Sequence, residues 1–134
     1  MNFIDLGLSV LWSNENYHND LYEYNLLYKD VDNINDYGRL PTVDEVNELI
    51  NNCEWIYDNN GFYVKGNNNQ IHLSFNYIDI PKKYLYEDGE INYKGIYWIK
   101  SPDKEKYVLS FIKKPIIEKV NELSYNQVRL VIDK

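Results

Sequence analysis

The chain contains few side chains of the kinds that enzymes use for nucleophilic or acid–base catalysis. Its single cysteine, Cys53, falls on the apolar side of an expected helix, where a cysteine behaves as a small hydrophobic residue. Neither His18 nor His72 has a second histidine or a cysteine at the spacing of a zinc site. Adjacent acids such as Glu87 and Asp88 are more typical of a charged loop than of a glycosidase pair. We therefore expect no catalytic residue, no metal and no cofactor, and a protein that is not an enzyme.

Tyrosines are the strongest candidates for a binding role. The chain has 14 of them, and several lie in or beside a polar excursion over residues 76–97. Aromatic rings in such a loop can stack on sugar rings or fill a pocket of a partner. The predicted ligand- or partner-binding residues are Tyr77, Tyr84, Tyr86, Tyr93 and Tyr97.

The tryptophans and arginines are expected to be structural. Trp12, Trp55 and Trp98 all fall in predicted strands, where we expect them to pack in the core. Arg39 and Arg129 are the only two arginines. Because an arginine fork pairs with carboxylates or backbone carbonyls, we expect these two to fix a helix entry and the C-terminal strand.

Length and charge restrict the class of protein. The chain has 134 residues, of which 44% are hydrophobic and 26% charged, and these values predict one globular domain over residues 1–134. Its formal net charge of −7 argues against nucleic acid and against an anionic membrane as partners. The sequence has no long apolar run and no recognisable signal peptide, so we expect folding in a cytoplasm and no signal-dependent secretion.

The clearest predicted element is a helix at about residues 42–53. Pro41 precedes it, Thr42 is a suitable N-cap, and Glu45 completes a capping-box pattern. One apolar stripe is expected along it, formed by Val46, Leu49, Ile50 and Cys53.

The rest of the pattern predicts strands and turns. A short helix is also permitted over residues 21–28. Strands are expected at residues 2–5, 9–13, 54–57, 62–65, 71–75, 96–100, 107–112, 116–120 and 127–132. Consecutive hairpins with one good helix predict an α+β fold with antiparallel sheets, in which the first and last strands pair.

Six segments, in the same order along the chain, resemble the Fibrobacter succinogenes major paralogous domain family, which occurs in gut Bacteroidota and their phages. The matching family patterns are "DLGLSVKWA" for residues 5–12, "GWRLPTKEEFEEL" for residues 38–42 with Glu45 and Leu49, "NNCTW" for residues 51–55, "GYKVTGPNGNSIFL" for residues 61–66 and 71–73, "GYYWSST" for residues 95–98 with Ser101, and "SVRPV" for residues 128–131. The resemblance implies a C-type-lectin-like fold with paired terminal strands and a long loop region that carries binding.

Calcium is a common ligand of lectins with that fold, but this sequence predicts a calcium-independent protein. The Glu-Pro-Asn and Trp-Asn-Asp triplets of calcium-dependent lectins are absent. Trp98 is followed by Ile99 and Lys100, whose side chains cannot bind calcium. Residues 30–36 are acidic at alternate positions but lack the glycine and the terminal glutamate of an EF-hand loop.

The expected function is therefore binding or structural. The resemblance favours a phage virion component, such as a head fibre, a decoration protein or a tail-associated protein. Its expected partner is a virion or host protein. Whether the protein forms a homo-oligomer is left open. One alternative is an intracellular inhibitor that binds a single protein. The other is a calcium-independent lectin of a gut bacterium that binds a glycan.

Overall fold

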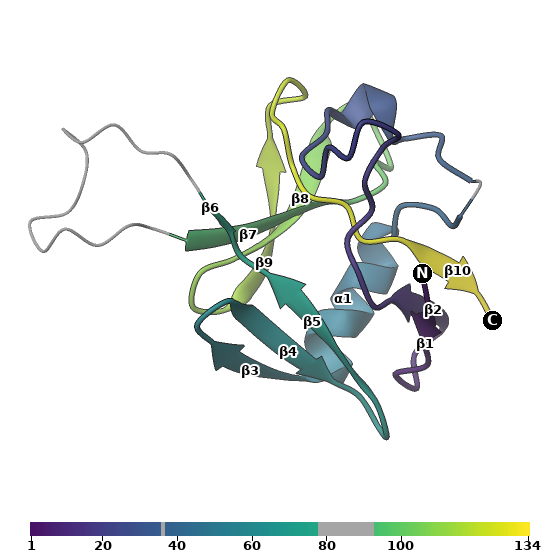
Figure 1. Ribbon diagram of the computed structural model, residues 1–134, viewed down its shortest axis with the longest axis vertical. Coiled ribbons are helices and arrows are strands. Elements are labelled where there is room, and N and C mark those ends of the chain that lie inside the picture. Colours follow the sequence, from purple (N-terminus) through teal and green to yellow (C-terminus); the bar gives the residue numbers. More distant parts are fainter. Residues whose placement is uncertain (36, 78–92) are drawn as a thin grey trace, which may run out of the picture.

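The computed structural model describes residues 1–35, 37–77 and 93–134, and these form one α-helix and three small antiparallel sheets (Figure 1). The fold is thus mixed α and β, as the hairpin pattern predicted. In chain order the elements are β1 (Phe3–Ile4), β2 (Val10–Ser13), the 3-10 helix η1 (Tyr28–Asp30), α1 (Val43–Asn52), β3 (Glu54–Asp58), β4 (Gly61–Lys65), β5 (Gln70–Ser74), β6 (Asn76–Tyr77), β7 (Tyr93–Trp98), β8 (Lys106–Phe111), β9 (Pro115–Val120) and β10 (Val131–Asp133).

Helix α1 begins with the predicted capping box. The Glu45 backbone N–H donates to Thr42 Oγ1 at 3.2 Å, and the Thr42 N–H donates to Glu45 Oε1 at 2.9 Å. Val46 and Leu49 are buried on its inner side. The helix ends at Cys53, whose backbone is extended and leads directly into β3. Local sequence signals therefore place the start of this helix, because Thr42 and Glu45 cap it within one turn.

The two ends of the chain meet in one sheet of order β1-β2-β10. Phe3 pairs with Ser13, and Val131 pairs with Trp12, both in antiparallel register. The predicted pairing of the first and last strands is confirmed.

The last predicted strand, 127–132, is only partly correct. The ladder with β2 is confined to Val131–Asp133. Before it, the extended segment 127–130 bonds to a different partner at almost every residue: Trp98 N–H donates to the Gln127 carbonyl at 3.0 Å, and Ser13 N–H donates to the Leu130 carbonyl at 3.0 Å. This segment runs between sheets and belongs to none of them.

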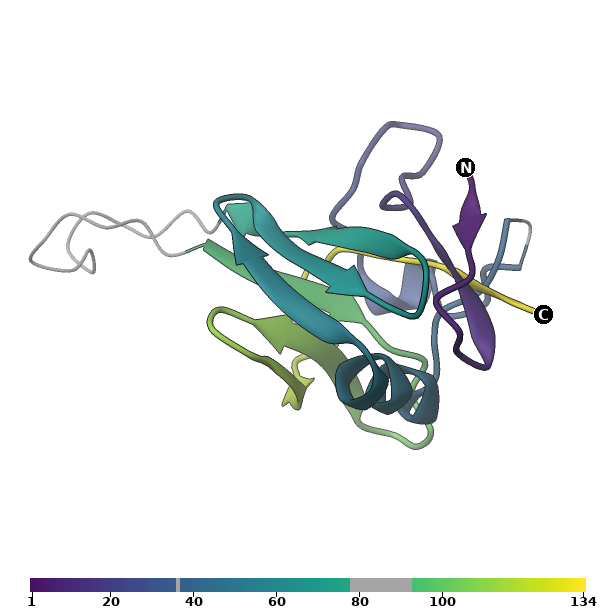
Figure 2. The ribbon, with the colours of Figure 1, turned by 90° about the horizontal axis from the view of Figure 1, so that it is seen from below.

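The other two sheets are built from sequential hairpins. Sheet β3-β4-β5 is a meander with a tight turn at residues 58–61, and sheet β6-β7-β8-β9 follows it in the chain. In the view of Figure 1, helix α1 lies between the β3-β4-β5 sheet and the terminal sheet, and Figure 2 shows that it packs to one side of both. In the described part of the chain, no helix is long and apolar enough to span a membrane.

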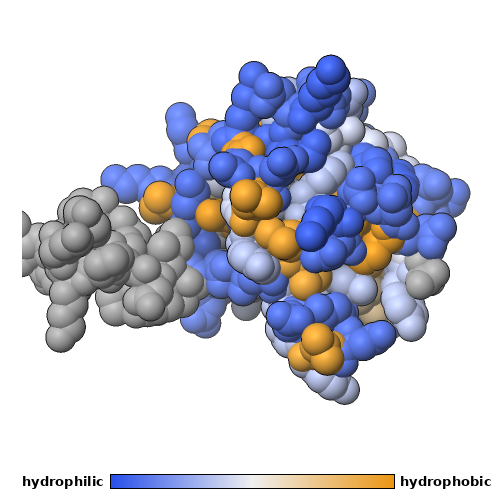
Figure 3. Space-filling view, turned by 90° about the horizontal axis from the view of Figure 1, so that it is seen from above, coloured by the Kyte–Doolittle hydropathy of each residue, from blue (hydrophilic) through white to orange (hydrophobic). Residues whose placement is uncertain are grey.

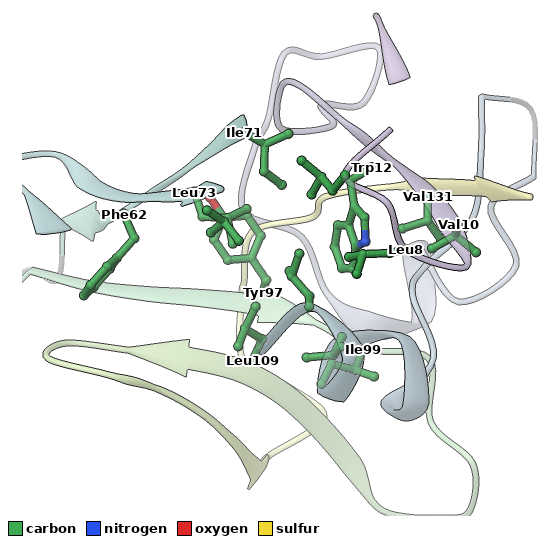
Figure 4. Packing of buried hydrophobic residues seen from close by; sticks show 14 of the residues in the cluster. Leu8, Val10, Trp12, Phe62, Ile71, Leu73, Tyr97, Ile99, Leu109 and Val131 are labelled. Atoms are coloured by element: carbon green, nitrogen blue, oxygen red, sulfur yellow. The ribbon is translucent and has the colours of Figure 1, made fainter. Parts of the chain in front are cut away.

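The core has two parts. The larger cluster lies over α1 and receives side chains from all three sheets, including Trp12, Leu73 and Leu109, which point into a common interior (Figure 4). The smaller cluster surrounds Trp98, where Leu26 and other residues of the 26–34 segment cover one end of the β7-β8-β9 face. The polar segment after β2 is thereby held against the sheet through its few apolar residues.

The helix permitted over residues 21–28 does not form, and that prediction is wrong. Leu21 and Tyr24 are exposed, and the only helical turn nearby is η1. The Asn19 side chain closes a tight loop here, and Tyr22 adopts a left-handed backbone conformation that interrupts a right-handed helix.

Candidate binding sites

The structure does not support a single binding surface formed by the five predicted tyrosines. Tyr84 and Tyr86 lie outside the described residues. Tyr77 ends β6 and pairs with Tyr93 at the start of β7. Tyr97 is only 3% exposed, and its hydroxyl lies 3.0 Å from the Ser74 backbone N–H, which donates to it. The expectation that Tyr97 belongs to an accessible binding surface is wrong, because strand alternation turns it into the core.

The three tryptophans lie where packing was expected. Trp12 and Trp98 are fully buried, and Trp55 is half-buried against the larger core cluster. Trp98 donates its indole N–H to the Leu26 carbonyl at 2.7 Å, and Trp55 donates to the Leu49 carbonyl at 3.2 Å. Trp98 therefore anchors the irregular segment at Leu26 as well as filling space.

Arg39 joins the helix entry to the C-terminal strand. Its Nη1 and Nη2 donate to both carboxylate oxygens of Glu45, and Nη2 also donates to Asp133 Oδ1 at 2.8 Å. These hydrogen bonds hold the pKa of Arg39 above its ordinary value. The backbone of Arg39 also exchanges two hydrogen bonds of 2.9 Å with Val131. All of these contacts are structural.

Arg129 is buried and forms a different set of contacts. Its Nε donates to Asn16 Oδ1 at 2.9 Å, Nη1 to the Ser13 carbonyl at 3.1 Å, and Nη2 to the His72 carbonyl at 2.7 Å. Burial lowers its pKa from the ordinary value, although Tyr97 opposes this shift. The guanidinium thereby ties the chain after β2 to β5 and to the C-terminal segment.

His72 and Cys53 have side chains of types that can act in catalysis, but both lie in surroundings typical of structural residues. His72 Nε2 lies 3.2 Å from Asp58 Oδ1 across the β3-β4-β5 meander, and its ring packs edge-on against Tyr63. Burial raises the pKa of the half-buried Cys53 thiol, so the reactive thiolate is disfavoured. Among the described residues, no three histidine, cysteine or acidic side chains come together as a metal site.

A tight loop, Asn19 to Glu23, was not predicted and displays aromatic side chains. The Asn19 Oδ1 accepts from the N–H groups of Leu21 (3.0 Å) and Glu23 (2.9 Å), and the Asn19 carbonyl accepts from the Tyr22 N–H at 3.0 Å. Tyr22 has a φ of +58°, a conformation that is unfavourable for a bulky residue. Its side chain is nevertheless 74% exposed, so core packing does not explain the strain.

Aromatic rings gather around that loop. The His18 ring stacks on Tyr22 with centroids 4.8 Å apart and planes 19° apart, and Tyr24 packs at a tilt on His18 at 5.2 Å. His18 Nδ1 lies 2.8 Å from the Asn19 carbonyl, and since a carbonyl only accepts, Nδ1 carries the hydrogen and donates it. The rings are thus held in place by the loop itself.

Beside these rings lies a hollow of about 350 Å³, which we call the aromatic hollow. That size is at the lower end of the range for small-molecule sites. Its lining residues are Met1, Glu15, Tyr17, His18, Asn19, Asp20, Tyr22 and Tyr37. Exposed tyrosines at the rim of a concave site are the side chains that recognition surfaces favour, because they offer large contact area at low entropic cost.

Sequence reasoning missed the aromatic hollow because residues 14–36 have no regular periodicity. Two signals were present in the sequence. Four aromatic rings, those of Tyr17, His18, Tyr22 and Tyr24, fall within eight residues of an otherwise polar segment. Asn19 in the middle of this group is a residue type that closes local turns through its side chain.

A second hollow, of about 450 Å³, lies along β7, β8 and β9 and the turn between β8 and β9. Lys94 and Ser110 there donate to Glu118 Oε1, each at 2.9 Å, and the Lys94 hydrogen bond lowers the pKa of Glu118. These three polar groups thus satisfy one another. The lining residues are Lys94, Ser110, Phe111, Ile112, Lys113, Lys114, Ile116 and Glu118.

Figure 3 shows the molecule from above the view of Figure 1, so that it faces the side on which η1 lies. Hydrophobic side chains on this face form a narrow run through its middle, bordered by hydrophilic side chains (Figure 3). A narrow run of this kind is ordinary for a surface in contact with water.

Fold and site together define a mixed α and β protein with a small, ring-lined hollow and structurally engaged arginines. No family model, curated protein or solved structure matches this chain. The resemblance to the Fibrobacter succinogenes paralogous family therefore stays a prediction that rests on the six sequence segments.

Proposed function

We propose that the protein is a non-catalytic binding module that holds a protein partner at the aromatic hollow. The observation that carries this proposal is the placement of Tyr22, a bulky, largely exposed residue in a left-handed conformation. Glycine and asparagine adopt the left-handed backbone conformation with little strain. A strained tyrosine on a water-exposed loop is best explained by a role for its ring in recognition.

The sequence resemblance supports a more specific setting, in which the module is part of a phage virion. The support for this setting is the order of the six matching segments, because the family occurs in phages of gut Bacteroidota as well as in their hosts. The competing proposal within the same class is an intracellular inhibitor that blocks one protein. A calcium-independent lectin is the second alternative, because tyrosine rings also stack on sugars.

The test of binding uses the full chain, immobilised, against a random peptide library and a glycan array. Three proteins are compared: the wild type, Tyr22→Ala, and Tyr125→Ala as a matched control. Tyr125 is 64% exposed, lies after β9 and is not among the residues that line the hollow. We expect the wild type and Tyr125→Ala to retain the same peptides and Tyr22→Ala to lose them. Equal retention by all three proteins would contradict the assignment of the hollow, and retention of glycans alone would favour the lectin.

The solution mass separates the virion component from the inhibitor. Light scattering after size exclusion, in dilute and concentrated samples, measures it directly. A stable trimer or a larger closed ring favours a virion assembly, since such assemblies repeat one interface around a symmetry axis. A monomer at every concentration favours the inhibitor.

A further inference from the structure

The charge around the aromatic hollow is acidic. Glu15 and Asp20 contribute carboxylates to its lining, while no lysine or arginine is among the described residues that line it. The one cation there is the N-terminal ammonium group of Met1, which lies 3.6 Å from Glu15 Oε1. Apart from that terminal group, the described lining carries negative charge and no lysine or arginine side chain.

The one asparagine among the described residues that line the hollow has its amide engaged within the loop. A sugar hydroxyl requires both donors and acceptors, which asparagine side chains commonly supply. The Asn19 amide is already used on both sides: its Oδ1 accepts from two backbone N–H groups of the loop, and its Nδ2 donates to Glu23 Oε1 at 3.0 Å. What the lining offers a ligand is carboxylate acceptors, ring faces and tyrosine hydroxyls.

Ring faces and carboxylates are the two groups that stabilise a cation. An aromatic face carries negative electrostatic potential and attracts an ammonium group within about 6 Å of its centroid. The Tyr22 ring has one face against His18 and is still largely exposed, so its other face is open to a ligand. The net charge of −7 adds an attraction for cations over the whole molecule.

We infer that the aromatic hollow binds the protonated amine of a lysine side chain on a partner protein. The inference rests on the proposed function and names the chemical group that the partner inserts. The ammonium group lies against the Tyr22 ring, and Asp20 balances its charge, since the Glu15 carboxylate already faces the Met1 ammonium group. The lysine stem packs against the remaining rings of the hollow.

The test is a titration of the ¹⁵N-labelled full chain followed by amide NMR. The probes are Nα-acetyl-lysine methylamide, Nα-acetyl-norleucine methylamide, which lacks the amine, and N-acetylglucosamine. We expect the lysine probe alone to shift the amide signals of residues 17–24 and of Tyr37. Added salt should weaken its binding, because exposed charges are screened.

Three variants localise the contact. Tyr22→Ala should weaken binding of the lysine probe about threefold to tenfold, the range of a cation–π contact. Tyr22→Phe keeps the ring and Tyr125→Ala leaves the hollow intact, so both should bind within about twofold of the wild type. If Tyr22→Ala fails to fold, the amide shifts of residues 17–24 in the wild type still test where the lysine probe binds.

Other outcomes overturn the inference and leave the proposed function to be judged by the peptide selection. Equal shifts by the lysine and norleucine probes would show apolar recognition. Shifts by N-acetylglucosamine alone would show a sugar site. No shift by any probe up to its solubility limit would show that the hollow does not hold an ammonium group, while selected peptides without lysine would still support a protein-binding module.

Discussion

Arg39 and Glu45 form a bidentate ion pair, in which Nη1 donates to Oε1 at 2.7 Å and Nη2 donates to Oε2 at 2.8 Å. Glu45 is also the acidic residue of the capping box, and Asp133 of β10 accepts a further hydrogen bond from the same guanidinium. One side chain thus connects the start of α1 to the end of the chain. Because the pair is fixed by two parallel bonds and a cap, it is stronger than an ordinary surface ion pair.

The pH dependence of stability should report this pair. Burial raises the pKa of Glu45, but the hydrogen bonds from Arg39 and Thr42 outweigh it, so the pKa lies below its ordinary value of 4.5. Ionised Glu45 therefore stabilises the fold above that value, and the stabilisation is lost as pH falls through the lower folded-state pKa. We expect Glu45→Gln to lower the free energy of unfolding by about 1–2 kcal/mol at pH 7, and the difference from wild type to shrink below about pH 4.

Urea unfolding of both proteins across this pH range measures the difference. Glu54→Gln is the matched control, because Glu54 is an exposed carboxylate on β3. The control should stay within about 0.5 kcal/mol of the wild type at pH 7. A Glu45→Gln difference that is the same at pH 7 and in acid would contradict the role of the ionised pair.

Replacing Arg129 should destabilise the fold more than replacing Arg39. Three acceptors, the Ser13 carbonyl, the His72 carbonyl and Asn16 Oδ1, depend on its guanidinium in a buried setting. We expect Arg129→Met to lower the free energy of unfolding by about 2–4 kcal/mol, since it leaves buried acceptors without donors. Arg129→Lys keeps the charge but cannot reach three directions at once, so it should lose most of the same stability.

Chemical denaturation at neutral pH tests both variants. An Arg129→Met protein as stable as the wild type would show that water or rearranged side chains satisfy the three acceptors. Arg129→Lys at wild-type stability would show that the charge, not the fork geometry, is what matters.

Local signals explain which parts of the fold the sequence predicts well. Helix α1 follows from Pro41, Thr42 and Glu45 because these residues lie within one turn of the helix start. The hairpins between β3, β4 and β5 follow from turn residues in the same way, since Asp58 and Gly61 close the first of them.

Tertiary contacts explain what the sequence does not predict. The segment 127–130 alternates like a strand, but its partners come from β2, β7 and the chain near Tyr17, which are distant in sequence. Tyr97 lies in a tyrosine-rich stretch, yet its position in β7 turns it toward Ser74. The aromatic hollow depends on Tyr37 approaching the 15–22 segment, and no local pattern encodes that approach.

Gly95 is predicted to be intolerant of a side chain. A Cβ at this position would lie 2.1 Å from Cε2 and Cζ of Phe111, whose ring is 1% exposed. Since a packed ring cannot move without disturbing its neighbours, we expect Gly95→Ala to destabilise the fold by about 1–3 kcal/mol. The pair Gly95→Ala with Phe111→Leu should cost less than the sum of the two single changes, measured by urea unfolding. Strictly additive changes would contradict a direct clash.

Tyr22 and Tyr24 provide a direct test of whether the strained residue serves binding. Both are exposed tyrosines that pack on His18, but only Tyr22 has a positive φ. The left-handed conformation costs a non-glycine residue about 1–2 kcal/mol, and glycine adopts it without this cost. Glycine lowers the free energy of unfolding by about 0.5–1 kcal/mol, however, because it makes the unfolded chain more flexible. Tyr22→Gly should therefore leave stability unchanged or raise it by about 1 kcal/mol, despite the loss of a ring contact.

Tyr24→Gly has no strain to relieve and should lower stability by about 0.5–1 kcal/mol. Urea unfolding ranks the two variants, and the peptide selection gives their binding. A Tyr22→Gly protein that is as stable as the wild type and no longer binds would separate the ring's contribution to recognition from any contribution to folding. If Tyr22→Gly is instead destabilised as much as Tyr24→Gly, the left-handed tyrosine is part of what holds the loop together, and its strain is no argument for function.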